Sequence, residues 1–212
     1  YARNNEGDIT AWTDKLVSME NACGGVGNDQ LLGDAGSNKL EGRAGNDTIN
    51  GGAGFDYVEY MDAAAAVVVN LATGVAKDGQ GGTDTLVNME GVMGSAFADM
   101  MIGDSKLNVF WGYAGNDSID GGAGTDEVRY EGNSTDYSWL TQTDGQVKVT
   151  DLRASAPDGV DLLKSIEKLV FADKTVTIGT DTGGGGSANP TSSAAALSGQ
   201  VYDWKSHALL SD

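Results

Sequence analysis

A repeat of nine residues limits the fold of this chain more than any other feature of its sequence. In residues 24–59 it is made up of the units GGVGNDQLL, GDAGSNKLE, GRAGNDTIN and GGAGFDYVE. The same phase returns in residues 94–129 as GSAFADMMI, GDSKLNVFW, GYAGNDSID and GGAGTDEVR. An apolar residue that recurs every nine positions, without partners three or four residues away, does not fit an amphipathic helix. The pattern predicts an all-β solenoid in which short strands alternate with tight turns.

Two units complete one coil of such a solenoid, so units n and n+2 stack on the same side. The eighth residues then point into a narrow core; they are Leu31, Leu40, Ile49, Val58, Met101, Phe110, Ile119 and Val128. The sixth residues stack in the turns; they are Asp29, Asn38, Asp47, Asp56, Asp99, Asn108, Asp117 and Asp126. Stacked carboxylates repel one another unless a cation lies between them. The turns are therefore expected to hold metal.

A longer period lies over the short one, because each unit of the second block follows its counterpart by 70 residues. A leader precedes each block, DKLVSMEN from Asp14 and DTLVNMEG from Asp84, and a third leader, DLLKSIEK, starts at Asp161. The leader carboxylates are Asp14, Asp84, Asp161, Glu20, Glu90 and Glu167. Their threefold recurrence favours turn caps and edge ligands over catalytic groups, since active sites seldom come in triplicate.

The chain is expected to contain two β-rolls with flanking β-hairpins. The first unit covers residues 1–93 with its roll at 24–59, and the second covers 94–179 with its roll at 94–129. Hairpins are predicted around Thr73-Gly74 and Asp144-Gly145, packed against the roll ends. Residues 180–193 resemble a Gly/Ser linker and 194–212 the start of a further β domain. We expect the chain to be part of a larger protein.

Charge and composition narrow the possible partners. The formal net charge of −18 disfavours nucleic acid and anionic membrane surfaces and favours cations. No apolar run approaches the ~18 residues of a membrane-spanning helix. Cys23 is the lone cysteine and His207 the lone histidine, so neither a disulfide framework nor a zinc, thiol or histidine-based catalytic site is indicated. Glycine-rich turns that offer carboxylates and backbone carbonyls suit a hard cation such as Ca²⁺.

The units GGAGTDEVR and GGAGFDYVE fit the pattern GGxGxDxUx outright, where U is aliphatic. In this the chain resembles the hemolysin-type calcium-binding repeats, the RTX family, over most of residues 14–178. The resemblance implies a parallel β-roll that binds several Ca²⁺ ions. In each implied site one turn gives the carbonyls of its second and fourth residues and its Asp, and the turn one coil later gives the carbonyls of its first and third residues and its own Asp.

Carried over to this chain, the resemblance implies four sets of ligands. In the first block they are Gly25, Gly27, Asp29, Gly42, Ala44 and Asp47, and then Asp34, Gly36, Asn38, Gly51, Ala53 and Asp56. In the second block they are Ser95, Phe97, Asp99, Gly112, Ala114 and Asp117, and then Asp104, Lys106, Asn108, Gly121, Ala123 and Asp126. Asp84 resembles a family position that holds an additional ion at the roll edge.

Some of these positions depart from the family pattern. Phe97 and Lys106 replace the fourth-position glycine, where a side chain is expected to conflict with the backbone turn. Asn38 and Asn108 offer a neutral oxygen, so their sites are expected to bind the cation more weakly than sites with two aspartates.

The function expected from these features is a calcium-binding structural module, with no catalytic activity, of a secreted or cell-surface bacterial protein. In the family, export commonly uses a type I channel, and folding on extracellular Ca²⁺ would follow. Two alternatives stay open. One is the C-terminal accessory roll of a secreted protease or lipase, and the other is an adhesin or surface-layer segment that associates with itself or with cell-surface components.

Overall fold

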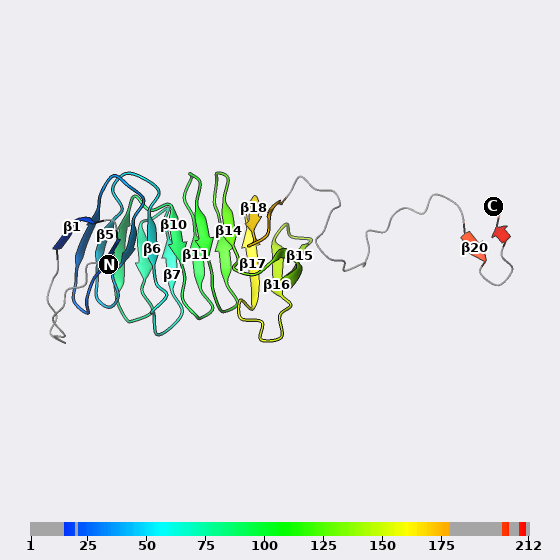
Figure 1. The fold of residues 1–212 in the computed structure, drawn as a ribbon, viewed down its shortest axis with the longest axis horizontal. Coiled ribbons are helices and arrows are strands. Elements are labelled where there is room, and N and C mark those ends of the chain that lie inside the picture. The colour runs from blue at the N-terminus through cyan, green and yellow to red at the C-terminus, as the bar shows by residue number, and fades with distance from the viewer. Residues whose placement is uncertain (1–14, 20, 179–200, 204–207, 211–212) are drawn as a thin grey trace.

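The computed structural model describes residues 15–19, 21–178, 201–203 and 208–210. The expected linker at 180–193, together with Asp14, Glu20 and His207, lies outside the described residues. Within them the fold is a two-sheet solenoid of short, mostly parallel strands (Figure 1), with one turn of 3-10 helix, η1 (Ser134–Asp136). The all-β parallel roll expected from the sequence is confirmed.

Two sheets face each other along the solenoid. The eight-stranded sheet contains, in spatial order, β19 (Thr175–Thr177), β18 (Lys168–Val170), β14 (Glu127–Arg129), β12 (Val109–Trp111), β10 (Gly91–Met93), β6 (Tyr57–Glu59), β4 (Lys39–Glu41) and β2 (Asn21–Cys23). The 11-stranded sheet contains β1 (Lys15–Met19), β3 (Gln30–Gly33), β5 (Thr48–Asn50), β9 (Thr83–Val87), β8 (Val75–Lys77), β7 (Val68–Asn70), β11 (Met100–Ile102), β13 (Ser118–Asp120), β17 (Val160–Lys164), β16 (Val147–Asp151) and β15 (Tyr137–Thr141).

The strand register confirms that two nonapeptides make one coil. Leu31 pairs with Ile49, and Leu40 with Val58, each one coil further along. All eight residues at the eighth position are at most 1% exposed, because alternate residues of a strand point to opposite faces and these point between the sheets. The core is thus one row of aliphatic and aromatic side chains behind each sheet.

The two rolls expected from the sequence lie end to end and share both sheets. In the eight-stranded sheet, β10 pairs in parallel with β6 of the first block and β12 of the second. In the other sheet, β7 and β8 form the first predicted hairpin, and β8 pairs with β9 while β7 pairs with β11. The hairpin therefore continues the sheet between the blocks instead of packing against a roll end. Both edges of the hairpin are paired, so it presents no open sheet edge.

The second predicted hairpin, β15–β16, extends the 11-stranded sheet beyond β17 by antiparallel pairing. Next to it, the rings of Tyr137 and Phe171 form a tilted pair with centroids 5.2 Å apart, and Trp139 stacks on Phe171 with centroids 5.3 Å apart. Aromatic side chains thus cover the core where the repeat ends. Separately, β20 (Val201–Asp203) and β21 (Ala208–Leu210) form an antiparallel pair.

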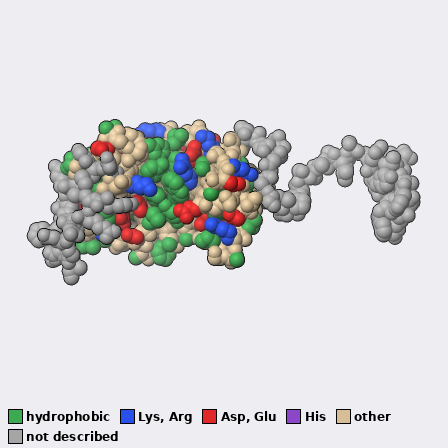
Figure 2. All heavy atoms as spheres, in the orientation of Figure 1, with side chains coloured by type: hydrophobic (Ala, Val, Ile, Leu, Met, Phe, Trp, Pro, Cys, Tyr) green, Lys and Arg blue, Asp and Glu red, His purple; other side chains and the backbone are tan. Residues whose placement is uncertain are grey.

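Figure 2 shows one face of the molecule, on which hydrophobic side chains gather in the middle and charged side chains of both signs lie around them. In the part of the chain that the structure describes, no helix is long and apolar enough to cross a membrane.

Candidate metal centre

The turns that join the two sheets form two edges of the solenoid. Edge 1 contains the turns 24–29, 42–47, 94–99 and 112–117, and edge 2 contains 33–38, 51–56, 103–108 and 121–126. In the second coil of each block the fourth residue has φ between +125° and +140°, a region that favours glycine; these residues are Gly45, Gly54, Gly115 and Gly124.

The fourth residues of the first coil in each block behave differently. Among the described residues with positive φ, neither Phe97 nor Lys106 is found, and neither are Gly27 and Gly36 at the matching positions. The conflict expected from Phe97 and Lys106 is therefore absent, because only the second coil of each block needs a glycine backbone at this position. The repeat alone does not distinguish the two coils.

A ladder of hydrogen bonds runs through the sixth residues of edge 1. The N–H of Asp29 donates to Oδ1 of Asp47 at 2.8 Å, and the N–H of Asp47 donates to Oδ1 of Asp84 at 3.0 Å. In the second block Asp99, Asp117 and Asp161 repeat this chain, with distances of 2.8 and 2.9 Å. Each carboxylate thus binds the backbone one coil earlier, and the leader aspartate ends the ladder.

Edge 2 carries the same ladder and ends in a glutamate. Asn38 donates its N–H to Oδ1 of Asp56 at 2.8 Å, and Asp56 donates to Oε2 of Glu90 at 3.1 Å. The second block repeats the chain at 2.7 Å in both steps; its members are Asn108, Asp126 and Glu167. The four leader carboxylates among the described residues therefore cap the last turn of each block, as the sequence predicted.

Four ladder aspartates keep one oxygen without a partner. They are Asp47, Asp56, Asp117 and Asp126; each is at most 1% exposed, and its buried Oδ2 makes no hydrogen bond. Burial, with repulsion from neighbouring carboxylates, raises the pKa of Asp47 to about 7 and that of Asp117 to about 8. A buried carboxylate oxygen without a donor is costly, and a cation would supply what is missing.

Oxygen atoms from two successive coils converge at the first glycine of the four first-coil turns, which are Gly24, Gly33, Gly94 and Gly103. A Cβ on Gly94 would lie 2.5 Å from Oδ2 of Asp99 and 3.0 Å from the carbonyl oxygen of Gly112. Equivalent cradles bring together Asp29 with Gly42, Asn38 with Gly51, and Asn108 with Gly121. In all four predicted sets, the sixth-position side chain and the first-position carbonyl of the next coil therefore meet.

Other predicted ligands lie close to the same stack with different contacts. The fourth-position carbonyls face the fourth-position glycine one coil later; they belong to Gly27, Gly36, Phe97 and Lys106. The carbonyls of Asp34 and Asp104 accept hydrogen bonds from the N–H groups of Ala53 and Ala123, at 3.3 and 3.1 Å. On edge 1, the second residue of the turn contacts the aspartate through its backbone N–H. Gly25 donates to Oδ2 of Asp29, and Ser95 donates to Oδ2 of Asp99, both at 2.6 Å.

The donor set fits a hard cation. Every polar atom that converges at the cradles is an oxygen, from carboxylates, amides or carbonyls, and such ligands suit Ca²⁺. Among the described residues, no three His, Cys, Asp or Glu side chains come together as a metal-binding group. A cation between the turns would therefore need the backbone carbonyls as well as the side chains.

Two tyrosines at the ends of the edge 1 ladders were not singled out from the sequence. Tyr60 donates its hydroxyl to Oδ2 of Asp84 at 3.0 Å, and Tyr130 donates to Oδ2 of Asp161 at 2.9 Å. Burial and the neighbouring carboxylates raise the pKa of both phenols well above the usual value. Their spacing of 70 residues is the signal that could have identified them.

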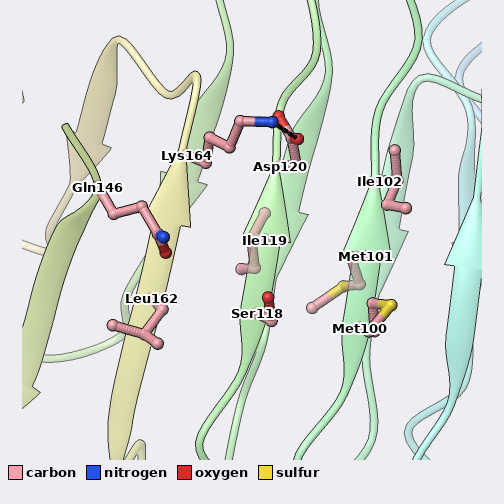
Figure 3. Close-up of a pocket in the computed structure, with 9 residues that line it drawn as sticks. All are labelled: Met100, Met101, Ile102, Ser118, Ile119, Asp120, Gln146, Leu162 and Lys164. Atoms are coloured by element: carbon pink, nitrogen blue, oxygen red, sulfur yellow. Dashed lines mark hydrogen bonds and ion pairs between the residues drawn. The ribbon is translucent and has the colours of Figure 1, made fainter. Parts of the chain in front are cut away.

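A hollow of about 250 Å³ lies on the 11-stranded sheet, over β11, β13 and β17 (Figure 3). Its two charged residues pair with each other, with Nζ of Lys164 2.6 Å from Oδ2 of Asp120. Although partial burial opposes the shift, this pair lowers the pKa of Asp120. None of the predicted metal ligands lines the hollow.

A family model described as RTX calcium-binding nonapeptide repeat (4 copies) matches residues 24–58 and 93–128. These ranges coincide with the two blocks of turns described above. A comparison with curated protein sequences gives no match.

Proposed function

Since residues 24–58 and 93–128 are RTX calcium-binding nonapeptide repeats, which mark a calcium-binding module of a bacterial protein, we propose that Ca²⁺ is what drives this module to fold. The observation that carries the proposal is the unpartnered Oδ2 of four buried aspartates. These aspartates lie in the second coil of each block, and the oxygens that converge at the cradles lie around the turns of the first coil. We assign one ion to each of the four ligand sets, and a further ion to the edge at Asp84.

Charge repulsion opposes folding, and calcium binding to the folded state favours it. The net charge of the chain is −18, and its core has only one row of residues per sheet. Repulsion among these charges therefore opposes folding. A ligand that binds only the folded state at about 100 times its dissociation constant adds about 2.7 kcal/mol per site. Several filled sites would then supply a large part of a typical domain stability of about 5–15 kcal/mol.

The cellular setting follows from the same linkage. In a calcium-poor cytoplasm the carboxylates repel one another and the chain stays unfolded, which suits export, and extracellular calcium then folds it. We propose that the parent protein is secreted or displayed at the cell surface, through a type I channel. Export assays on the parent protein, in cells with and without a type I transporter, test this route. Export that does not depend on the transporter contradicts it.

The test of coupled folding is a calcium titration of the chelator-treated chain, followed by circular dichroism and calorimetry. We expect the β signal and a cooperative thermal transition to appear with calcium. Magnesium should replace it poorly, because Mg²⁺ prefers a tighter octahedral shell and retains its waters. A chelated chain that keeps the full β signal and melts cooperatively at neutral pH would refute the proposal.

We propose that the chain has no catalytic activity of its own. The leader carboxylates of both edges already cap turns, and the charged pair in the hollow is satisfied. The test assays the calcium-loaded chain against peptide, ester and glycoside substrates. Turnover that disappears in Glu90→Gln, with calcium binding intact, would contradict this proposal.

A further inference from the structure

The leader aspartate that ends the first ladder of edge 1 is held from two sides. Oδ1 of Asp84 accepts the backbone N–H of Asp47 at 3.0 Å, and Oδ2 accepts the hydroxyl of Tyr60, also at 3.0 Å. The two donors come from separate segments, so together they fix the plane of the carboxylate. An ionised carboxylate has about four lone-pair positions, and two therefore stay open for a cation.

The second block repeats this arrangement. Asp161 accepts the N–H of Asp117 through Oδ1 and the hydroxyl of Tyr130 through Oδ2, both at 2.9 Å. The chain between tyrosine and aspartate is longer here, because the two residues are 31 positions apart instead of 24. The contact is thus kept although the connecting segment changes in length, which a contact made by the local turn alone would not explain.

Both tyrosine rings cross the core between the sheets. Tyr60 follows β6 and Tyr130 follows β14, in the eight-stranded sheet, whereas Asp84 and Asp161 lie in β9 and β17 of the 11-stranded sheet. The tyrosines are 3% and 7% exposed and belong to the hydrophobic core. A buried hydroxyl needs an acceptor, and here the acceptor is a carboxylate at the edge. Each phenol therefore connects the end of an edge 1 ladder to the opposite sheet.

Repulsion acts against the position of Asp84. Asp47 and Asp78 each have a buried Oδ2 without a partner. Burial, and with it repulsion from Asp78, raises the pKa of Asp84 to about 6, while the hydrogen bonds from Asp47 and Tyr60 oppose that rise. Like charges turn away from each other unless they are held. The Tyr60 hydroxyl therefore keeps the carboxylate of Asp84 beside the other carboxylates that a cation would neutralise.

We propose that Tyr60 and Tyr130 are positioning residues for calcium, each of which holds a leader aspartate in the orientation that serves the ion at the end of its ladder. This inference rests on the proposed function, because it needs an ion at the end of edge 1. It adds to that function two side chains outside the nonapeptide units, which touch the aspartates and not the ion. Partners of this kind orient the groups that bind a metal.

The experiment compares Tyr60→Phe with the unmodified chain in calorimetric calcium titrations with a competing chelator. The change keeps the ring in the core and removes only the donor. We expect one ion to bind about 10- to 100-fold more weakly, the usual effect of losing a partner of a metal ligand, and the other ions to keep their affinities. A hydroxyl that serves packing alone would leave every affinity unchanged, or would shift all of them together, and either result overturns the inference.

Terbium gives a readout that a packing role does not change. Tb³⁺ occupies calcium sites, and a phenol close to the bound ion sensitises its emission. In saturating Tb³⁺ we expect Tyr60→Phe to lose part of the sensitised emission. Tyr57→Phe is the matched control, because Tyr57 lies next to the inward-facing Val58 and so points to the outer face of the eight-stranded sheet. It should keep both the emission and the calcium affinities, and equal losses in the two variants would contradict the proposal.

Asp84→Asn tests whether the tyrosine acts through the aspartate. Tyr60→Phe added to Asp84→Asn should cost little further calcium affinity, whereas additive losses would refute the inference. If Tyr60→Phe does not fold in saturating calcium, as judged by circular dichroism, the same measurements on Tyr130→Phe and Asp161→Asn decide. If the chain binds several ions and the tyrosine variants bind them unchanged, the inference is wrong and the proposed function stands. A chain that binds no calcium overturns both.

Discussion

The backbone N–H of Asp29 lies 2.8 Å from Oδ1 of Asp47, one coil further along the roll. The two oxygens of the Asp47 carboxylate therefore have different roles. Oδ1 accepts a hydrogen bond from the preceding coil, while Oδ2 is buried without a donor. On each edge, a single aspartate of the second coil therefore holds the backbone stack with one oxygen and offers the other to the cation that we propose between the turns. Removing it should affect stability and calcium affinity together.

Replacing Asp47 should cost more calcium affinity than replacing Asn38. Asp47→Ala removes a buried charge with an unpartnered oxygen, whereas Asn38→Ala removes a neutral amide that already bonds to Asp34 through Nδ2 and Oδ1. We expect about a tenfold or greater loss for Asp47→Ala, and a smaller one for Asn38→Ala. Calorimetric titration of the two variants measures the difference. Equal or reversed losses would contradict the ranking.

The strict phase of the repeat made the roll predictable. Leu31, Ile49, Phe110 and their equivalents recur at one position of nine, and no other regular structure buries such a residue every nine positions. The pairing one coil apart follows from the same count. For the same reason the leader carboxylates Glu90 and Glu167 could be expected at turn edges, since their repeated place before or after a block marks a structural role.

Contacts made by segments outside the nine-residue repeat could not be predicted in this way. Hairpin β7–β8 shows apolar residues around a turn, but that pattern does not say which strands lie on its two sides. Asp78 looks like an ordinary turn aspartate, and only the fold shows that its side chain is buried beside Gly45. The partner of the Tyr60 hydroxyl is likewise 24 residues away.

Replacing a glycine should cost most where φ is positive and a Cβ would also collide with the backbone of the neighbouring coil. Gly124 and Gly145 both have positive φ, +140° and +85°, but a Cβ on Gly124 would collide with the carbonyl of Lys106, whereas one on Gly145 meets nothing within 4 Å. We expect Gly145→Ala to cost about 1 kcal/mol of unfolding free energy. Gly124→Ala should cost at least twice as much.

Denaturant unfolding in saturating calcium measures both glycine variants. If Gly145→Ala destabilises the chain as much as Gly124→Ala does, backbone conformation alone accounts for the glycine, and the close approach of the coils contributes nothing.

The two phenylalanines of the second block should differ sharply in their effect on stability. Phe110 is fully buried in the core row, while Phe97 lies in a turn and is 43% exposed. Phe110→Ala should lower the unfolding free energy by about 3–5 kcal/mol, through lost burial and a cavity. Phe97→Ala should change it by about 0.5 kcal/mol or less. Because only the carbonyl of Phe97 is a proposed ligand, calcium affinity should also survive this change, and calorimetry would show otherwise if the ring mattered.

The stability of the chain should depend on pH in opposite directions with and without calcium. Without metal, burial and carboxylate repulsion raise the pKa of Asp84 and of Asp126 to about 6, of Asp47 to about 7 and of Asp117 to about 8. In an unfolded chain an aspartate has a pKa of about 3.9. The folded state therefore binds more protons than the unfolded state between these values, so its stability falls as pH rises from about 4 to about 8.

In a chelating buffer we therefore expect the melting temperature to fall as pH is raised from 5, until the cooperative transition is lost near neutral pH, and the β signal to be strongest at the acid end. In saturating calcium it should rise over the same interval, because protons compete with the cation for the same oxygens. Thermal scans followed by circular dichroism measure both series. Asp117→Asn provides the internal check, since an amide cannot titrate and should flatten the slope in chelator. A melting temperature that climbs with pH in chelator would mean that these carboxylates are not buried together in the metal-free fold.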